Sequence, residues 1–287
     1  MKKLKHTLTK DTVFKHFFVD NQDLLKNLVS EILGIRVGAI RNFLIKNPTV
    51  PKKHLKNKNC VLDIIMEVNK QLVNLEVQVR DEHDYPERSL YHWARCYAGA
   101  LKESEEYIKL PRTIAINIVD FVLFKDTKDF HSEFRALEIK RHTELTDRMS
   151  LHYFELKKLP KVAASDAGNG LKMWLALFNA KTEEDMAKIE KIGGRTMKQA
   201  VHAYRNVIAS EKFKNDERMR ERARHDEISA LAYAKRKGET IGKKKGKAEG
   251  IAEVFSLIEQ GYSVKEAKAM LTQRKRTTKK SKTVTRT

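Results

Sequence analysis

The segment from Cys60 to Arg80 constrains the fold of this chain more than any other stretch. Two runs rich in Val, Ile and Leu flank the dipeptide Asn69-Lys70, and Asn tolerates the positive φ angles that a two-residue hairpin loop requires. The segment therefore predicts an antiparallel hairpin. With that loop at its tip, the pairing of the two strands places Asp63 directly opposite Glu76.

The two faces of this hairpin differ in polarity, because side chains alternate along a strand. One face is apolar throughout and is expected to pack on a core: Leu62, Ile64, Met66, Val68, Val73, Leu75, Val77 and Val79. The other face is mixed and carries Val61, Asp63, Ile65, Glu67, Leu72, Asn74, Glu76, Gln78 and Arg80. Like charges in directly opposed positions, roughly 5 Å apart at Cβ, destabilise a sheet, so the pair requires an exposed edge or a cation.

A divalent metal ion would supply that positive charge. Mg²⁺ binds hard oxygen ligands and characteristically takes one or two carboxylates, several waters and a substrate phosphate. The alternative is a solvent-exposed sheet face on which two acidic residues happen to meet, and a register slip of one residue would separate Asp63 from Glu76. Pairing alone leaves both interpretations open.

The residues around the hairpin predict alternating helices and strands. Asp11 is expected to cap a first helix, and Gln22 to Leu33 a second that ends at Gly34. A helix from Glu87 to Leu101 follows the hairpin, and Arg112 to Phe124 reads as a strand buried on both faces. The order strand, strand, helix, strand results. Further elements are expected at Ile35–Ile45 (weakly strand-like), Leu151–Leu156 (strand), Leu171–Asn179, Glu183–Ile192, Met197–Ser210, Ile251–Gly261 and Val264–Leu271 (helices).

The helix after the hairpin is expected to present a basic face to a substrate. Helical spacing puts four residues on one broad face: Arg88, Tyr91, His92 and Arg95. For a nucleic-acid substrate, Arg88 is a candidate for contacting a phosphate and Tyr91 for contacting the backbone, whereas the alternative is an ordinary exposed basic face. The opposite face is expected to pack on the protein through Trp93, Cys96, Tyr97 and Ala100.

The formal charge of +20 indicates a polyanionic partner, since such an imbalance bears on partners and not on fold. Residues 211–287 hold 22 Lys or Arg against 11 Asp or Glu and supply +11, so the remainder still carries +9. Within this part Gly recurs every four residues from Gly238 to Gly250, and Lys243, Lys244 and Lys245 are expected to touch DNA phosphates or a partner helix. Residues 274–287 are expected to be disordered and to bind nucleic acid without sequence choice.

The composition indicates a cytoplasmic protein. The two cysteines, Cys60 and Cys96, form neither a disulfide framework nor a zinc spacing. No signal peptide is evident at the N-terminus. The longest apolar run, Ile114 to Phe124, is too short for a bilayer, which needs about 20 residues, so no membrane partner is expected.

Several motifs together resemble a known family. Asp63 and the later Leu75-Glu76-Val77-Gln78 resemble the Asp...Glu-X-Gln form of the PD-(D/E)XK nuclease superfamily, in particular the recombination-promoting nuclease and putative transposase family. Further matching pieces are Asp11-Thr-Val-Phe-Lys15, Arg88-Ser-Leu-Tyr-His-Trp93 and Phe130-His131-Ser132. The likeness covers roughly residues 6 to 230. No piece is specific alone, but their order and spacing are.

The sequence departs from the superfamily motif at two positions. Leu62 stands where the motif name has Pro, a position that tolerates many residues. Gln78 stands where the wider superfamily has Lys, which removes a charge that would orient water or stabilise the transition state. The resembled branch usually carries Gln there.

The resemblance implies an α/β fold with a restriction-endonuclease-like core, in which helices flank a central mixed sheet, followed by a helical C-terminal extension and a basic tail. The expected divisions are a nuclease-like core at 1–160, a helical extension at 161–232 and a basic segment with the tail at 233–287.

The resemblance also implies a metal site for Mg²⁺ (or Mn²⁺). Asp63, Glu76 and the backbone carbonyl of Val77 would hold the ion, and Gln78 would position the attacking water. Glu31, on an early helix, would complete the metal shell, unless it is a solvated glutamate. His131 is a candidate substrate contact, although histidines without such a role are common.

Three functions follow from these patterns. The first is a metal-dependent DNA endonuclease whose cuts promote recombination or transposition. The second is a catalytically inactive nucleic-acid-binding protein on a degenerate nuclease scaffold, which the charge supports equally well. The third is an interaction module formed by the helices from Leu171 onward, which would also allow a homodimer.

Overall fold

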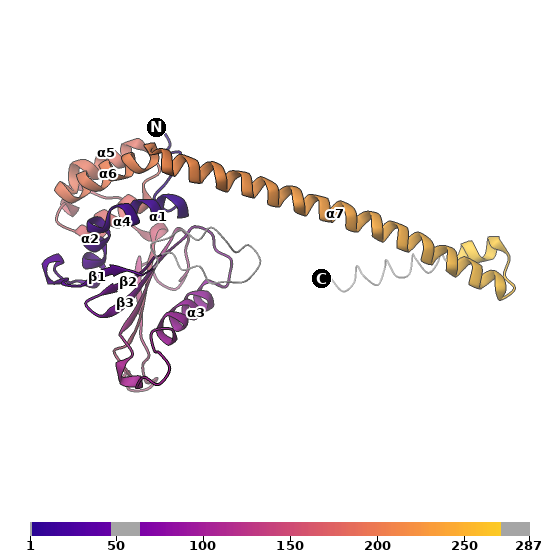
Figure 1. The fold of residues 1–287 in the computed structure, drawn as a ribbon, viewed down its shortest axis with the longest axis horizontal. Coiled ribbons are helices and arrows are strands. Elements are labelled where there is room, and N and C mark those ends of the chain that lie inside the picture. Colours follow the sequence, from indigo (N-terminus) through magenta and orange to yellow (C-terminus); the bar gives the residue numbers. More distant parts are fainter. Residues whose placement is uncertain (1, 47–63, 271–287) are drawn as a thin grey trace. The chain divides into compact units, whose positions relative to one another are not determined.

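The computed structural model describes residues 2–46 and 64–270, and these include a mixed β-sheet of six strands in the order β1-β2-β3-β4-β6-β5 (Figure 1). The strands β3, β4 and β6 are parallel neighbours, while β1, β2 and β5 pair antiparallel. Their bounds are Phe43–Ile45 (β1), Ile64–Val68 (β2), Gln71–Gln78 (β3), Thr113–Val119 (β4), His131–Phe134 (β5) and Met149–Glu155 (β6). The expected mixed sheet is present.

The hairpin of β2 and β3 has the predicted loop. Asn69 and Lys70 adopt φ angles of 49° and 66°, as a two-residue turn of type I′ requires. The ladder runs from Val68↔Gln71 to Ile64↔Leu75, which confirms the predicted register over the described residues. Asp63 and the tail at 274–287 lie outside the described residues, so the pairing of Asp63 with Glu76 stays a prediction.

Asn69 is suited to this turn by its side chain as well as by its φ angle. Its Oδ1 accepts hydrogen bonds from the backbone of Arg41 (2.9 Å) and Asn42 (3.2 Å), and its Nδ2 donates to the carbonyl of Ala39 (2.9 Å). The turn thereby holds the segment that leads into β1. Of the stretch expected to be weakly strand-like, only β1 is a strand, and Val37–Ala39 forms a 3₁₀ turn.

The central strand β4 is buried at all seven positions, as its continuous apolar sequence predicts. It ends at Val119, earlier than expected. The following loop is instead held by Glu155, whose buried Oε1 accepts hydrogen bonds from the backbone of Leu123 (2.5 Å) and Phe124 (3.2 Å). The predicted order strand, strand, helix, strand is confirmed by β2, β3, α3 (Tyr85–Ala98) and β4.

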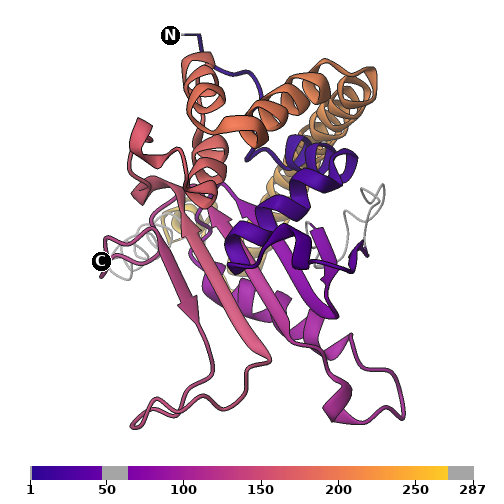
Figure 2. The ribbon, with the colours of Figure 1, turned by 90° about the vertical axis from the view of Figure 1, so that its left-hand side faces the viewer.

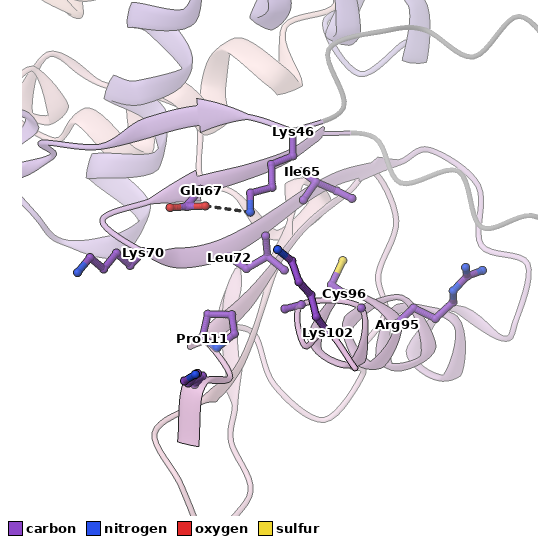
Figure 3. Close-up of a pocket in the computed structure, with 12 residues that line it drawn as sticks. Lys46, Ile65, Glu67, Lys70, Leu72, Arg95, Cys96, Lys102 and Pro111 are labelled. Carbon is purple, nitrogen blue, oxygen red and sulfur yellow. Dashed lines mark ion pairs between the residues drawn. The ribbon is translucent and has the colours of Figure 1, made fainter. Parts of the chain in front are cut away.

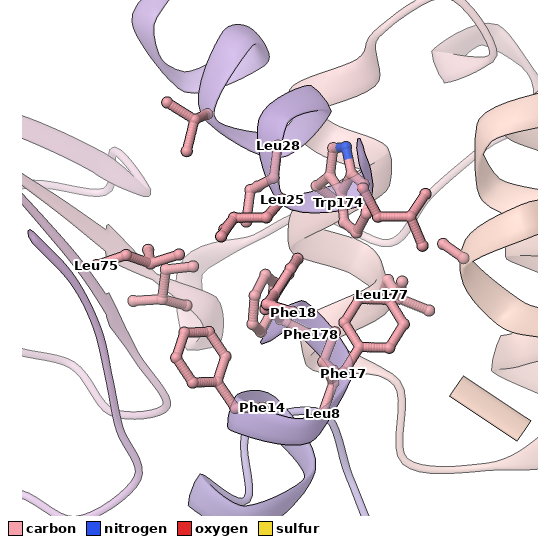
Figure 4. Packing of buried hydrophobic residues seen from close by; sticks show 14 of the residues in the cluster. Leu8, Phe14, Phe17, Phe18, Leu25, Leu28, Leu75, Trp174, Leu177 and Phe178 are labelled. Atoms are coloured by element: carbon pink, nitrogen blue, oxygen red, sulfur yellow. The ribbon is translucent and has the colours of Figure 1, made fainter. Parts of the chain in front are cut away.

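One face of the sheet is covered by helices from both ends of the sequence: α1 (Asp11–Asp20), α2 (Gln22–Leu33) and α4 (Gly170–Asn179) (Figures 1 and 2). The helices α5 (Glu183–Ile192) and α6 (Gly194–Ala209) pack outside them, against α4 and α1. Phe14, Phe18, Trp174 and Phe178 are fully buried and meet Leu75 of the sheet in one hydrophobic core (Figure 4). The apolar face of the hairpin therefore packs as predicted. The helices after residue 161 share this core with the sheet.

Two details of these helices differ from the sequence expectations. The first helix begins at Asp11, with Lys10 at the cap position, and the Asp11 carboxylate pairs with Lys15 Nζ at 2.7 Å instead of capping the helix. At the other end of the chain, the expected helix from Ile251 is the last part of α7 (Glu211–Glu259), one continuous helix, and a short helix follows at 264–270.

The chain divides into two compact units, Met1–Glu217 and Arg218–Thr287. The first turns of α7 belong to the first unit. There the ring of Phe213 is buried and lies edge-on to His6 and His16, with centroid separations of 5.2 and 5.9 Å. The three-part division expected from the sequence stays a prediction.

Candidate active site

The second face of the sheet is covered by α3, which begins with Pro86 in its first turn as expected (Figure 1). Residues of the sheet that point toward α3 include Asn74, Glu76 and Gln78 of β3, because they alternate with the core residues Val73 and Leu75. In the parallel ladder Glu76 pairs with Asn117 of β4. The polar face of the hairpin therefore lies beneath a helix and is not an exposed edge.

Glu76 is the centre of this polar face and is only 6 % exposed. Its Oε1 accepts one hydrogen bond from Asn74 Nδ2 (2.8 Å) and a second from His92 Nδ1 (2.7 Å). His92 comes from α3 and is 9 % exposed. A buried carboxylate is costly unless it is paired and hydrogen-bonded, and in the described structure the imidazole and the amide meet that requirement.

His92 is the residue of this site whose role sequence reasoning missed. The sequence placed it on an exposed basic face, but the buried positions of α3 are Tyr85, Ser89, His92 and Cys96. Their spacings of four, three and four residues trace one helical stripe, but the residues around α3 are mixed in polarity, so the spacing alone did not single this stripe out. The expected packing face is confirmed for Cys96, which is buried, and for Trp93, which packs on the second hydrophobic cluster and donates to the carbonyl of Thr113 at 2.8 Å. The prediction is wrong for His92, which belongs to the buried side.

The stripe continues the polar contacts toward the neighbouring strands. Tyr85 donates its hydroxyl to Asn117 Oδ1 (3.0 Å), and the Asn117 amide donates to the carbonyl of His152 (3.1 Å). Ser89 Oγ lies 2.5 Å from the hydroxyl of Tyr153, and burial raises the pKa of the Tyr153 phenol. A buried polar band thus joins α3 to β3, β4 and β6, and such a band fixes the helix over Glu76.

One atom of this band has no partner among the described residues. Asn74 Oδ1 is buried and accepts no hydrogen bond, although the same amide donates to Glu76. Buried polar atoms in folded proteins are nearly always bonded to protein, water or an ion. Amide and carboxylate oxygens are ligands for hard divalent cations, so the donor chemistry beside Glu76 fits such a cation.

The other residues of the predicted catalytic motif lie close by on β3. Gln78 is half-buried and its Nε2 donates to the carbonyl of Arg80 (2.9 Å). Val77 points to the opposite face, where it packs against the main core, and it pairs with Ile118 in the parallel ladder.

Glu31 does not join Glu76 in the described structure. Its carboxylate lies at the start of α4, so close to Gly170 that a Cβ atom added there would be 2.3 Å from Glu31 Cδ. Its helix α2 packs in the main core, on the face of the sheet opposite α3. Among the described residues no three His, Cys, Asp or Glu side chains gather as a metal-holding group, so Glu31, Glu76 and His92 form none.

The substrate contacts predicted on α3 are Arg88, Tyr91 and Arg95, and they differ in whether another side chain already pairs with them. Arg88 donates to Glu82 (2.7 Å) and its guanidinium lies 5.0 Å from the centre of the Tyr85 ring. Tyr91 is 54 % exposed, and the guanidinium of Arg95 lies 6.0 Å from the centre of its ring. Tyr91 and Arg95 are therefore available to a ligand, whereas Arg88 already has an acidic partner.

His131 lies on the other face of the sheet. It pairs with Phe154, whose side chain is in the main core, and its ring stacks on Phe154 at 4.4 Å. His131 Nε2 lies 3.1 Å from His152 Nδ1, and burial lowers the pKa of His131. The structure thus gives His131 a packing environment away from Glu76.

Lys243, Lys244 and Lys245 are exposed residues of α7 in the second unit. Lys245 Nζ lies 3.8 Å from Glu249 one turn later, a separation at which an exposed pair contributes little. No helix among the described residues combines the length and the apolarity that spanning a membrane needs.

Comparison with known proteins assigns the chain to a family. The sequence model of one family, described as PD-(D/E)XK nuclease family transposase, matches residues 8–234. No curated protein and no solved structure matches the chain. The matched region includes the whole sheet, the helices on both of its faces and Glu76 with its partners. The chain therefore belongs to the PD-(D/E)XK nuclease family transposases, and its mixed sheet between helices is a restriction-endonuclease-like α/β fold.

Proposed function

We propose that the protein is a metal-dependent DNA endonuclease whose cuts promote recombination or transposition. Its family consists of nucleases, and PD-(D/E)XK nucleases generally use divalent metals. The observation that carries the proposal is the Glu76 carboxylate, held by His92 and Asn74 beside the unpartnered Asn74 Oδ1. A formal charge of +20 adds the attraction for phosphate that DNA binding requires.

Asp63, Glu76 and the backbone carbonyl of Val77 would hold Mg²⁺ or Mn²⁺. When bound, such a metal supplies a water of lowered pKa and a positive charge that offsets charge developing on the phosphate. If the register of the described hairpin continued by one pair beyond Ile64↔Leu75, Asp63 would stand opposite Glu76. This expected pairing supports assigning both carboxylates to one ion.

The side chains around Glu76 have separable tasks in this mechanism. His92 and Asn74 fix one oxygen of the carboxylate, so the other oxygen keeps a defined direction. Gln78 lies two residues further on the same face, and its amide oxygen accepts no hydrogen bond from the described residues, so it can orient the attacking water. The polar band beneath α3 keeps bulk water from the sheet side of the carboxylate.

Cleavage of supercoiled plasmid tests the proposal. The wild-type protein should convert the plasmid to nicked or linear DNA with Mg²⁺ and not with EDTA. Glu76→Gln should slow cleavage by at least about 100-fold, since even the partners of metal ligands are worth 10- to 100-fold. The same preparations should bind DNA equally in EDTA. Glu76→Gln cleaving at the wild-type rate would refute the assignment.

A second candidate function is DNA binding without catalysis. Two observations favour it: the Glu76 carboxylate is buried and already hydrogen-bonded, and Gln78 replaces the lysine of the wider superfamily. In that case the wild type and Glu76→Gln should bind DNA equally and leave the plasmid uncut in Mg²⁺ and in Mn²⁺. Metal-dependent nicking separates the two functions.

A further inference from the structure

A basic cavity of about 680 Å³ opens at the C-terminal end of α3, beside the start of β3 (Figure 3). We call it the basic pocket. Ile65 and Leu72 contribute apolar surface from the hairpin, and Cys96 contributes it from α3. Leu72 precedes Asn74 and Glu76 on the same face of β3, so the basic pocket and the candidate active site lie along one strand.

Positive charge predominates in the basic pocket. Its lining contains one carboxylate, that of Glu67, which pairs with Lys46 at 2.9 Å (Figure 3). It also contains five cationic side chains: Lys46, Lys70, Arg95, Lys102 and Lys109. Among the described residues no carboxylate lies within ion-pair distance of Lys70, Lys102 or Lys109. Uncompensated like charges around one concave surface repel each other, and an anionic ligand removes that repulsion.

The arrangement of these cations favours a chain of phosphates over a single one. They come from separate places in the fold: the end of β1, the hairpin turn, α3 and the segment that leads to β4. Beside them Tyr91 is exposed, with the Arg95 guanidinium over its ring. Aromatic faces and cations side by side are the usual combination for a nucleic-acid strand, because bases stack on the ring while phosphates meet the charges.

The distance to Glu76 sets the position on the substrate. Leu72 and Glu76 are four residues apart on one strand, which corresponds to about 13 Å at about 3.3 Å per residue. Successive phosphates of one DNA strand advance about 3.4 Å along the helix axis. Because the strand also winds around that axis, about 13 Å corresponds to a few nucleotides at most from the bond that Glu76 would address.

We propose that the basic pocket binds the backbone phosphates of the DNA strand a few nucleotides from the cleavage position. This inference rests on the proposed function for its reference point, the scissile phosphate at Glu76. Lys70 and Lys102 supply the principal charge, because they line the pocket without an acidic partner in the described structure. Tyr91 offers a stacking face to a base of the same strand.

DNA binding without metal tests the inference independently of cleavage. The full-length protein and Lys70→Gln/Lys102→Gln are titrated onto a fluorescent duplex in EDTA, between 50 and 200 mM salt. Losing two phosphate contacts should reduce the slope of log K against log salt by about 1.8, so the affinity advantage of the wild type shrinks about tenfold over this range. Lys188→Gln/Lys191→Gln, on exposed α5 positions outside the pocket, should keep the wild-type slope.

Two further arms identify the source of the phosphate. Lys70→Arg/Lys102→Arg, which keeps both charges, should keep the slope. Neutral methylphosphonate linkages within about four nucleotides of the position at which the wild type cuts a defined duplex should weaken wild-type binding and leave binding by Lys70→Gln/Lys102→Gln unaffected.

An unchanged slope in Lys70→Gln/Lys102→Gln would overturn the inference. The inference would also be overturned if inorganic phosphate or a mononucleotide displaced DNA from the wild type but not from this variant, while the salt slope of the variant stayed at the wild-type value. That result would mean that the pocket binds a small phosphate ligand and not the DNA backbone. A protein that never cleaves, yet shows the slope change, would lose the proposed function and retain the pocket.

Discussion

Replacing His92 by leucine tests whether the Glu76 carboxylate depends on the imidazole above it. The substitution places an apolar side chain of similar volume in the buried stripe of α3. It removes the Nδ1 donor that lies 2.7 Å from Glu76 Oε1. Glu76 is 6 % exposed, so water cannot fully replace the lost bond. Asn74 then remains as the donor to this oxygen among the described residues.

The size of the effect follows from the burial of both partners. A hydrogen bond to a charged group is worth about 1.5–3 kcal/mol, and leaving a buried charge without its partner costs about 3–5 kcal/mol. His92→Leu should therefore lower the free energy of unfolding by about 3 kcal/mol. In the Glu76→Gln background the same change should cost about 2 kcal/mol less, because no buried charge is left without its partner.

Urea unfolding in EDTA at pH 7 measures this coupling through the double-mutant cycle of wild type, both single variants and the double variant. A coupling energy below about 0.5 kcal/mol, the level of additivity for independent sites, would refute the dependence of Glu76 on His92. Repeating the cycle with Mg²⁺ adds a second readout. Metal should stabilise His92→Leu more than Glu76→Gln, since only the former retains the carboxylate.

Two other predictions concern stability. Burial lowers the pKa of His152 to about 4 from its ordinary value of 6.5, so the unfolded chain binds this proton at a higher pH than the folded chain does. Up to about 3 kcal/mol of stability should therefore be lost as the pH falls from 6.5 toward 4. Urea unfolding of His152→Gln should show a shallower loss over this range, and a loss equal to that of the wild type and of the exposed control His202→Gln would contradict the prediction. Asn69→Ala should lower the thermal midpoint by the equivalent of about 1–2 kcal/mol, because alanine is strained at this positive φ angle and three hydrogen bonds are lost. Asn69→Gly loses the same hydrogen bonds without the strain and should cost less. Equal losses in the two variants would mean that backbone strain plays no part.

The hairpin could be predicted from sequence because its information is local. A two-residue loop fixes the register by itself, and Val, Ile and Leu at alternate positions choose the buried face. The buried strand β4 was equally accessible, since an apolar run needs cover on both sides. Its early end was not, because the loop after Val119 is held by Glu155, which lies far away in sequence.

The partner of Glu76 could not be read from the sequence for a related reason. The helix α3 carries aromatic, polar and cationic residues around its whole circumference, so composition does not identify which side faces the sheet. The phase is set by Tyr85, Ser89 and His92, whose partners lie on three different strands. Such partners become visible only when the strand order is known.

Phe213 determines where the two units of this chain can be separated by truncation. A chain ending after α6 would expose the surfaces of His6 and His16 that its ring covers. It would also delete the acceptors used by His16 (Asp216, 2.9 Å) and by Thr12 (Glu217, 2.5 Å). A change in the activity of such a protein would reflect lost contacts of α1. A truncation that removes residues of the second unit should therefore begin beyond Glu217.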